Sequence, residues 1–533
     1  MQKTLLIHPD DNLMVALKDL TAGQTVHWQG QAYTLITDVP AKHKFVTEDR
    51  AVGDIVYMYG VPVGKATKPL KKGERVTTEN IKHYAKQVQL TDNQPYHWTA
   101  PDVSGWQNRT FKGVIREDGR VGTANYWLII PLVFCQNRNV QKLQEALAKP
   151  LGYSQDQYSD VTLSLLGQTT LEKPITPNRP FPNIDGIRTL TVNSGCGGTA
   201  YDSKSLCKVL AAYADHPNVA GITVFSLGCE KAQVSIFDQV LKERNPQFNK
   251  PYLFFKQQEW ASEDEMMAQA IKQTFEQLKL ANEVKRQPVP LSKLKIGVKC
   301  GGSDGFSGIS ANPAMGIVSD IVVTLGGASA LAEFPELCGA EGNMVSRCIH
   351  EQDKVHFLEL MQHYEQEANS CGASISDNPS PGNIKDGLIT DAIKSTGAAK
   401  KAGNAPISAV VDYSEPMAES GLSLVCTPGN DLEAVTGQVA AGANVVIFST
   451  GLGTPTGNPI VPVLKIATNT QVAQKLPHMI DFDCGPVIEG VPLQEVAEQL
   501  LEKVIATASG EYIVQADRLE QYDFLFWKRN VSL

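Results

Sequence analysis

A glycine-rich turn in the middle of the chain combines a thiol, a hydroxyl and a carboxylate. The turn is Cys300-Gly301-Gly302-Ser303-Asp304, and it follows an apolar run, 294–298, that predicts a buried strand. Glycine lets the backbone bend through positive φ and lets a ligand approach closely. Carboxylates and hydroxyls in such a turn can transfer protons or hold a polar ligand. We therefore expect a ligand site at this turn.

More polar side chains follow within the next forty residues or so of the sequence. Asn312, followed by Pro313, predicts the capped start of a helix. A second apolar run, 328–332, predicts a strand, and three carboxylates come soon after it: Glu333, Glu336 and Glu341. Because open α/β sheets bind ligands at the carboxyl ends of their strands, we expect these groups to gather near the turn.

Two other interpretations of the glycine-rich loops are weaker. Residues 301–305 also satisfy GxSxG, the nucleophile elbow of α/β-hydrolases, but an irregular run stands where a helix should begin at once. Residues 451–457 resemble a dinucleotide loop, but Asn458-Pro459 cannot cleanly start the helix that a pyrophosphate needs. We favour a tight substrate-binding turn over a hydrolytic Ser303.

Two cysteines at predicted strand ends, Cys196 and Cys229, have two interpretations. Together they could bind a soft or borderline metal ion. Cysteine is also often buried and inert, and the spacing alone favours that structural role. The loop 377–383 is rich in amides and hydroxyls, which suits a polyol ligand or a plain turn.

The sequence divides into four segments by its rhythm. Residues 1–88 contain short apolar runs between turn signals and predict a β-rich domain. Residues 89–112 predict a linker. Strand and helix patterns alternate in residues 113–286 and again in residues 287–533, which predicts two α/β domains with largely parallel sheets. A proline-rich stretch at 287–290 marks the boundary between them.

Composition excludes several classes of function. The net charge of -9 argues against nucleic acid or an anionic membrane as a partner. No apolar run approaches the roughly 18 residues of a membrane span, and the first residues do not predict a secretory signal. The ten cysteines include no CxxC pair, which suits a reducing cytoplasm. We expect a cytoplasmic protein with a small-molecule partner.

At the level of whole phrases the chain resembles the altronate/galactarate dehydratase family. The phrases that carry this resemblance include KHKF, GCGG, SLGCE, KCGGSDGFSGISANPAMG, EFPELCGAE, DNPSPGN, CTPGND, FSTGLGTPTG, KIATN and IDFDCG. They extend over nearly the whole chain. The resemblance implies a small antifreeze-like (SAF) β domain followed by α/β domains.

The resemblance also implies a chemistry and a set of residues. The family eliminates water from sugar acids to give 2-keto-3-deoxy acids, with Fe²⁺ or Mn²⁺ as cofactor. The resemblance marks Asp304, Glu341 and Lys465 as candidate site residues without saying which is the base, and we expect Asp304 to act as acid or ligand and Glu341 or Lys465 as base. The resemblance also implies a set of candidate substrate-binding residues: Ser303, Asn312, Glu336, Asn378, Ser380, Asn383 and Asn469. We expect the metal ion near His43, Cys196, Cys229 and Glu230.

The chain departs from the family pattern at several positions. Thr77 and Glu79 stand where the family usually has histidines, so we expect altered or weaker iron binding. Leu452 stands where the family has a carboxylate-binding arginine. We expect a homo-oligomeric hydro-lyase of hexuronate degradation that converts D-altronate, or a related aldonate or aldarate, to 2-dehydro-3-deoxy-D-gluconate. The alternatives are a sulfolactate-type lyase and a non-catalytic sugar-acid-binding paralogue.

Overall fold

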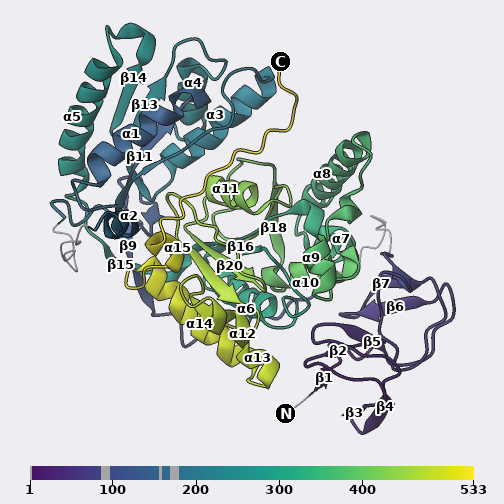
Figure 1. Cartoon of the computed structure of the whole chain (residues 1–533). Coiled ribbons are helices and arrows are strands. Elements are labelled where there is room, and N and C mark those ends of the chain that lie inside the picture. Colours follow the sequence, from purple (N-terminus) through teal and green to yellow (C-terminus); the bar gives the residue numbers. More distant parts are fainter. Residues whose placement is uncertain (1–2, 86–95, 155–158, 168–178) are drawn as a thin grey trace.

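The structure is a computed structural model of the chain, and it describes residues 3–85, 96–154, 159–167 and 179–533. A β-rich region, a four-stranded α/β region and a seven-stranded α/β region follow one another along the chain (Figure 1). The predicted fold class, a small β-rich domain followed by α/β domains with largely parallel sheets, is confirmed. Among the described residues, every helix is too short or too polar to cross a membrane.

The β-rich region contains three small sheets whose strands all pair antiparallel. Their orders are β1-β2-β5, β3-β4 and β6-β7-β8. Strand β2 is buried on both faces, so its four residues contribute to two apolar clusters of this region. The strands are β1 (Thr4–Leu5), β2 (Leu13–Ala16), β3 (Thr25–Trp28), β4 (Gln31–Thr34), β5 (Lys44–Val46), β6 (Ile55–Met58), β7 (Val61–Ala66) and β8 (Ile81–Lys82).

The second region has a parallel sheet in the order β12-β11-β13-β14. Strand β11 is apolar along its whole length because helices cover both faces of the sheet. Its elements are β11 (Tyr126–Pro131), α1 (Asn137–Ala148), α2 (Ser159–Leu165), β12 (Gly186–Thr189), α3 (Ala200–Asp215), β13 (Val219–Ser226), α4 (Val234–Arg244), β14 (Tyr252–Lys256) and α5 (Glu263–Ala281).

A three-stranded antiparallel sheet, in the order β10-β9-β15, lies where the two α/β regions meet. Its strands are β9 (Thr110–Ile115), β10 (Val121–Gly122) and β15 (Gln287–Pro290). The sequence pattern had marked 287–290 as a proline-rich boundary, and these residues instead form a strand. Two prolines fit there because β15 is an edge strand, where only one side of the backbone must pair.

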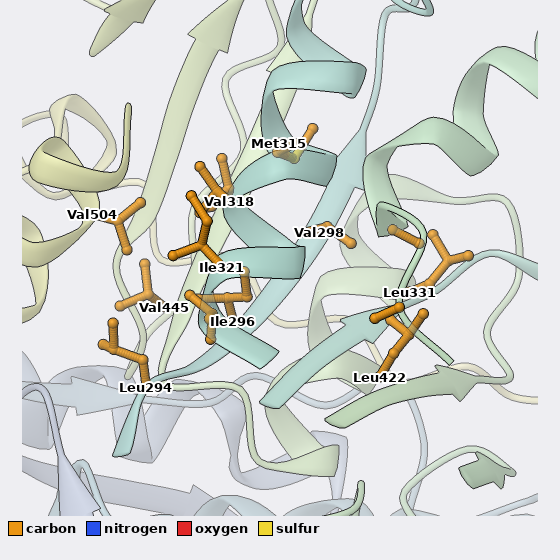
Figure 2. Packing of buried hydrophobic residues seen from close by; sticks show 14 of the residues in the cluster. Leu294, Ile296, Val298, Met315, Val318, Ile321, Leu331, Leu422, Val445 and Val504 are labelled. Atoms are coloured by element: carbon orange, nitrogen blue, oxygen red, sulfur yellow. The ribbon is translucent and has the colours of Figure 1, made fainter. Parts of the chain in front are cut away.

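The third region is built on a seven-stranded parallel sheet in the order β18-β19-β17-β16-β20-β21-β22. Figure 2 shows the packing of α6 over this sheet, where Ile321 lies beside Ile296 in the same apolar cluster as Met315 and Val318. Helices α6 and α14 cover one face, and α11 lies between the other face and α3 of the second region.

The strands of this region are β16 (Lys295–Cys300), β17 (Ala328–Leu331), β18 (Ile407–Val411), β19 (Gly421–Val425), β20 (Val445–Thr450), β21 (Val463–Ala467) and β22 (Phe482–Asp483). Its helices are α6 (Ala311–Thr324), α7 (Glu341–Arg347), α8 (Glu351–Ser370), α9 (Pro381–Lys385), α10 (Asp391–Ala399), α11 (Asp431–Ala441), α12 (Thr470–Lys475), α13 (Pro486–Glu489), α14 (Leu493–Ala508) and α15 (Gln515–Arg518).

The start of α6 differs from the prediction. Ser310 is the N-cap residue, and Asn312 lies inside the first turn. The amide of Asn312 donates a hydrogen bond to the Gly397 carbonyl at 3.0 Å and accepts one from Ser449 Oγ at 2.6 Å. The predicted capping role of Asn312 is therefore wrong, because residues from elsewhere in the fold use both ends of its amide.

Candidate active site

The candidate site lies at the carboxyl edge of the seven-stranded sheet, where β16 and β20 end side by side. The chain passes from β16 to β17 on one side of the sheet and later returns to β20 on the other, so this is a switch point of the topology. The Gly451 N–H donates to the Gly302 carbonyl at 3.0 Å and joins the two loops. A Cβ on Gly451 would lie 2.3 Å from Cγ of Asp304, so glycine is needed there.

Asp304 is the centre of the site. Its side chain is fully buried. One carboxylate oxygen accepts hydrogen bonds from Thr468 Oγ1 at 3.1 Å and Asn469 Nδ2 at 3.3 Å, both just after the end of β21. The same oxygen lies 3.0 Å from Nζ of Lys42, which belongs to the β-rich region. A buried carboxylate and a partly exposed ammonium from different domains therefore meet here.

The segment Lys42-His43-Lys44 docks the β-rich region onto the site. His43 Nε2 lies 3.0 Å from the carbonyl oxygen of Lys385. The Lys44 ammonium donates to the Gly387 carbonyl at 2.7 Å. Burial lowers the pKa of Lys44 to about 7, although the charge of Asp304 acts in the opposite direction. A Cβ on Gly387 would lie 2.4 Å from the Lys42 carbonyl oxygen, so the two segments touch through their backbones.

Sequence reasoning selected His43 from this segment and missed both lysines. The available signal was the phrase KHKF, whose two lysines flank the chosen histidine. Their partners lie in the third region, so no local pattern could connect them.

Ser303 and the loop 378–383 line the same turn. Ser303 Oγ is buried and has no hydrogen-bond partner among the described residues. The Asn383 amide donates to the Ser303 carbonyl at 2.8 Å. Ser380 caps α9, accepting from the Asn383 N–H at 3.2 Å and donating its own N–H to Asn383 Oδ1 at 3.0 Å. Asn383 and Ser380 thus hold the turn, and the Ser303 hydroxyl is left for a ligand.

A second, buried charge cluster lies beside the turn. The Lys401 ammonium contacts Glu333 at 3.3 Å, Glu336 at 3.1 Å and the Cys300 sulfur at 3.0 Å. The Lys299 ammonium lies 2.7 Å from the other Glu333 oxygen. Burial raises the pKa of Glu333 to about 7. Burial also opposes ionisation of Glu336, but Lys401 and its neighbouring lysines hold the pKa of this carboxyl well below its usual range.

Two more residues connect this cluster to the surface of the loops. Lys394 contacts Glu336 at 3.2 Å and donates a hydrogen bond to the Asn378 amide oxygen. Lys299 also contacts Asp431, at the start of α11, at 2.6 Å. Glu336 and Asn378, both predicted to bind substrate, therefore lie in one network. Cys300, which belongs to this network, precedes Asp304 by four residues in the chain.

No three of the predicted metal ligands come within 4.8 Å of one another in the described part of the chain. The loops of Cys196 and Cys229 pack together in the second region, where the Lys231 N–H donates to the Gly195 carbonyl. Glu230 accepts from the Gly228 N–H at 2.7 Å. His43 is held at Lys385 in another region, and no group of three ligand atoms includes it. Glu79 is exposed in the turn before β8.

One other set of atoms has the spacing of a metal site. The possible ligand atoms of Cys300, Glu333 and Glu336 lie within 4.8 Å of one another. The Lys401 ammonium already contacts all three residues and takes the place that a cation would occupy. Burial also raises the pKa of the Cys300 thiol to about 11, which disfavours the thiolate that a metal requires. The described residues therefore do not fit the expected Fe²⁺ or Mn²⁺.

Lys465 and Glu341 lie apart from the contacts of Asp304. Lys465 donates from Nζ to Gln521 Oε1 at 3.1 Å, and burial lowers the pKa of its ammonium to about 8. Glu341 accepts from the Gly339 N–H at 2.7 Å. The catalytic roles expected for these two residues stay predictions.

The two alternative interpretations of the glycine-rich loops lack the required geometry. Nine residues lie between Gly301 and the start of α6, where a nucleophile elbow requires the helix to begin at once. The Ser303 hydroxyl has no hydrogen-bonded base among the described residues. No helix follows the loop 451–457 before β21 begins at Val463. Neither a nucleophile elbow nor a dinucleotide loop is present at these positions.

Comparison with known proteins agrees with this domain order. Residues 2–84 match the model "Altronate/galactarate dehydratase SAF domain", residues 113–282 match "D-galactarate dehydratase/Altronate hydrolase, second domain", and residues 291–532 match "D-galactarate/Altronate dehydratase, C-terminal". The altronate dehydratase of Bacillus subtilis (strain 168) is 33% identical over 534 residues, which cover 100% of each chain. The chain belongs to the altronate/galactarate dehydratase family.

Two further relatives in this family are similar over nearly their whole length. The altronate dehydratase of Escherichia coli (strain K12) is 32% identical over 99% of each chain. The galactarate dehydratase (L-threo-forming) of the same organism is 28% identical over 95% of this chain and 92% of its own. The predicted family and the predicted SAF domain are confirmed, and the chain is an altronate dehydratase-like hydro-lyase.

Proposed function

We propose that the protein eliminates water from a sugar acid, with D-altronate as substrate and 2-dehydro-3-deoxy-D-gluconate as product. The observation that carries this proposal is the contact between the buried Asp304 and the partly exposed Lys42, 3.0 Å apart at the switch point of the sheet. A carboxylate and an ammonium in contact, beside a hydroxyl without a partner among the described residues, suit proton transfer to and from a polyhydroxylated ligand. Full-length similarity to two altronate dehydratases supports the choice of substrate.

The reaction requires removal of a proton from C2 and loss of the hydroxyl from C3. In our proposal the Asp304 carboxylate takes the C2 proton, and the electron pair of that C–H bond forms the C2–C3 double bond. The C3–O bond breaks, and the hydroxyl leaves as water with a proton from the Lys42 ammonium. The resulting enol tautomerises to the 2-keto acid.

The pair then returns to its starting state by one proton transfer. Asp304 holds an extra proton and Lys42 lacks one, so a transfer across their 3.0 Å contact restores both. Lys42 also places positive charge where negative charge develops on the enediolate. Ser303 Oγ and the Asn469 amide bind substrate hydroxyls. This assignment gives the base role to Asp304 and uses neither Lys465 nor Glu341.

The proposed mechanism assigns no role to iron or manganese. The resemblance implies such a cofactor, but the described residues form no site that fits it, so no step above passes through a metal. A homo-oligomeric state is likewise proposed, and size-exclusion chromatography with light scattering measures it.

Turnover of a substrate panel tests the proposed function. D-altronate, galactarate, D-gluconate and sulfolactate are incubated with the full chain, and 2-keto-3-deoxy acid or sulfite is measured. We expect fastest turnover of D-altronate and loss of turnover in Lys42→Met. Sulfite release with no dehydration would favour the alternative lyase. Saturable binding of sugar acids without turnover, with or without added iron, would favour a non-catalytic binding protein.

A further inference from the structure

A cavity lies between the two α/β regions, away from Asp304. Its volume is about 560 Å³. Residues of β11 and β12 line one side, among them Tyr126 and Arg188, and the segment 512–522 lines the other. None of the residues that contact Asp304 takes part in its lining.

Arg188 is the unusual residue of this cavity. Its side chain is 5% exposed, and its Nε is buried without a hydrogen-bond partner. No carboxylate oxygen of the described residues lies within 4 Å of its nitrogens. The guanidinium lies over the ring of Tyr522, with 3.8 Å from Cζ to the ring centroid, and near the ring of Tyr126 at 5.2 Å. The charges of Asp517 and Glu520 favour the charged form of Arg188 from a distance, but its buried Nε–H lacks an acceptor among the described residues. An unsatisfied buried donor is costly, and an oxyanion in the cavity would supply the acceptor.

The backbone of β12 is shaped around this guanidinium. Gly186 lies two residues before Arg188 and therefore on the same face of the strand. A Cβ at Gly186 would lie 2.6 Å from Nη1 of Arg188 and 2.9 Å from Nη2. Any side chain at position 186 would displace the planar group that faces the cavity.

The other charged groups of the cavity define the ligand further. Arg286 forms an ion pair with Asp185 at 3.0 Å and donates to the Thr123 carbonyl at 2.7 Å. Asp185 therefore already neutralises the charge of Arg286. Asp517 and Glu520 also line the cavity. They would accept hydrogen bonds from hydroxyl groups and would repel a second anionic group.

Arg179 and Arg518 line the cavity as well, and each donates from Nε to a backbone carbonyl, of Gly152 and of Ile513. Arg188 is the lining arginine whose buried Nε has no such acceptor among the described residues, so the lining suits a ligand with one oxyanion at Arg188 and several hydroxyls.

We propose that this cavity binds a small polyhydroxylated molecule with one carboxylate or phosphate group, whose oxyanion Arg188 holds through two hydrogen bonds. Because residues of both α/β regions line the cavity, the ligand stabilises their contact. The proposal is independent of the reaction assigned to Asp304.

Isothermal titration calorimetry of the full chain tests this site with two probes, inorganic phosphate and D-gluconate. Wild type is compared with Arg188→Met and with Arg138→Met, a matched control. Arg138 lies on the exposed face of α1, paired with Glu263 at 2.8 Å. We expect saturable binding of one probe by wild type and Arg138→Met, and a dissociation constant at least about ten times higher in Arg188→Met.

The two probes identify the ligand chemistry, and two further variants protect the test against misfolding. Dependence on Arg188 for phosphate alone indicates a phosphorylated ligand, and for gluconate alone a carboxylate. Arg188→Lys keeps the charge but loses the planar fork, and Gly186→Ala keeps Arg188 but displaces it, so both should weaken binding. Equal binding of both probes by wild type and by every folded variant, or no binding of either probe by wild type, would overturn the proposal.

Discussion

Replacement of Asp304 by asparagine separates charge from shape at the centre of the active site. The substitution keeps the size of the side chain, so it opens no cavity in a position that is fully buried. It removes the negative charge that faces Lys42 at 3.0 Å and replaces one of the two acceptor oxygens with a donor. Thr468 and Asn469, which now donate to that carboxylate, then lose an acceptor or force the amide to turn.

The expected loss of rate follows from the role assigned to the carboxylate. If Asp304 takes the C2 proton, Asp304→Asn should lower kcat by ~10²–10⁴-fold with D-altronate, the usual contribution of a general base. A residue that only orients substrate should instead change KM as well. The loss of one charge-assisted hydrogen bond should lower the free energy of unfolding by about 1.5–3 kcal/mol, which urea denaturation measures.

A matched variant tests whether the effect belongs to Asp304 itself. Asp386 is the other carboxylate near the Lys42 ammonium, at 3.6 Å, and its side chain is more exposed, at 28%. Asp386→Asn removes the same charge from a position that we assign no proton transfer, so its kcat should fall less than about tenfold. Wild-type kcat in Asp304→Asn would refute the mechanism. An equal loss in both variants would show that the charge around Lys42, and not proton transfer by Asp304, sets the rate.

Three further predictions concern the buried lysines and the metal. Lys401→Met leaves Glu333 and Glu336 without their shared cation, so urea denaturation should show a loss of about 3–5 kcal/mol, and an unchanged midpoint would contradict the pairing. Folding lowers the pKa of Lys44 from 10.5 to about 7, so between these pH values the unfolded chain binds more protons than the folded chain. The free energy of unfolding should therefore rise with pH in that range, by up to about 1.4 kcal/mol per pH unit. Lys44→Met should remove that part of the slope, and an identical slope in both proteins would show that Lys44 keeps its ordinary pKa. Wild type and Cys300→Ala, both purified without chelator, should have the same content of iron and manganese by elemental analysis, because Lys401 occupies the position that a metal ion would take. Stoichiometric metal in wild type that is lost in Cys300→Ala would contradict the placement of Lys401.

The parallel sheets were the most predictable part of the fold. The apolar runs 294–298 and 328–332, which predict strands, coincide to within two residues with β16 and β17. Buried parallel strands are continuous apolar runs, so the pattern is unambiguous when turn residues flank them.

The candidate site was predictable only where its residues follow strands of one sheet. Ser303 and Asp304 were selected from the glycine-rich turn and Asn469 from the family resemblance, and the ends of β16 and β21 bring Asp304 and Asn469 into contact. Lys42 was not selected, because its partner lies in a different region of the fold. The lysines that surround Glu333 were also missed, since a buried cation is invisible until its carboxylate is placed beside it.

The contact of the SAF domain with the active site sets an order of events during synthesis. Lys44 and the Gly387 carbonyl that binds it are separated by 343 residues. At roughly 5–20 residues per second, a ribosome needs on the order of twenty to seventy seconds to cover that distance. The SAF domain therefore leaves the ribosome long before its docking surface exists. The hydrogen bond from the Lys44 ammonium to the Gly387 carbonyl, and the influence of the Asp304 charge on Lys44, therefore begin only when the two domains meet.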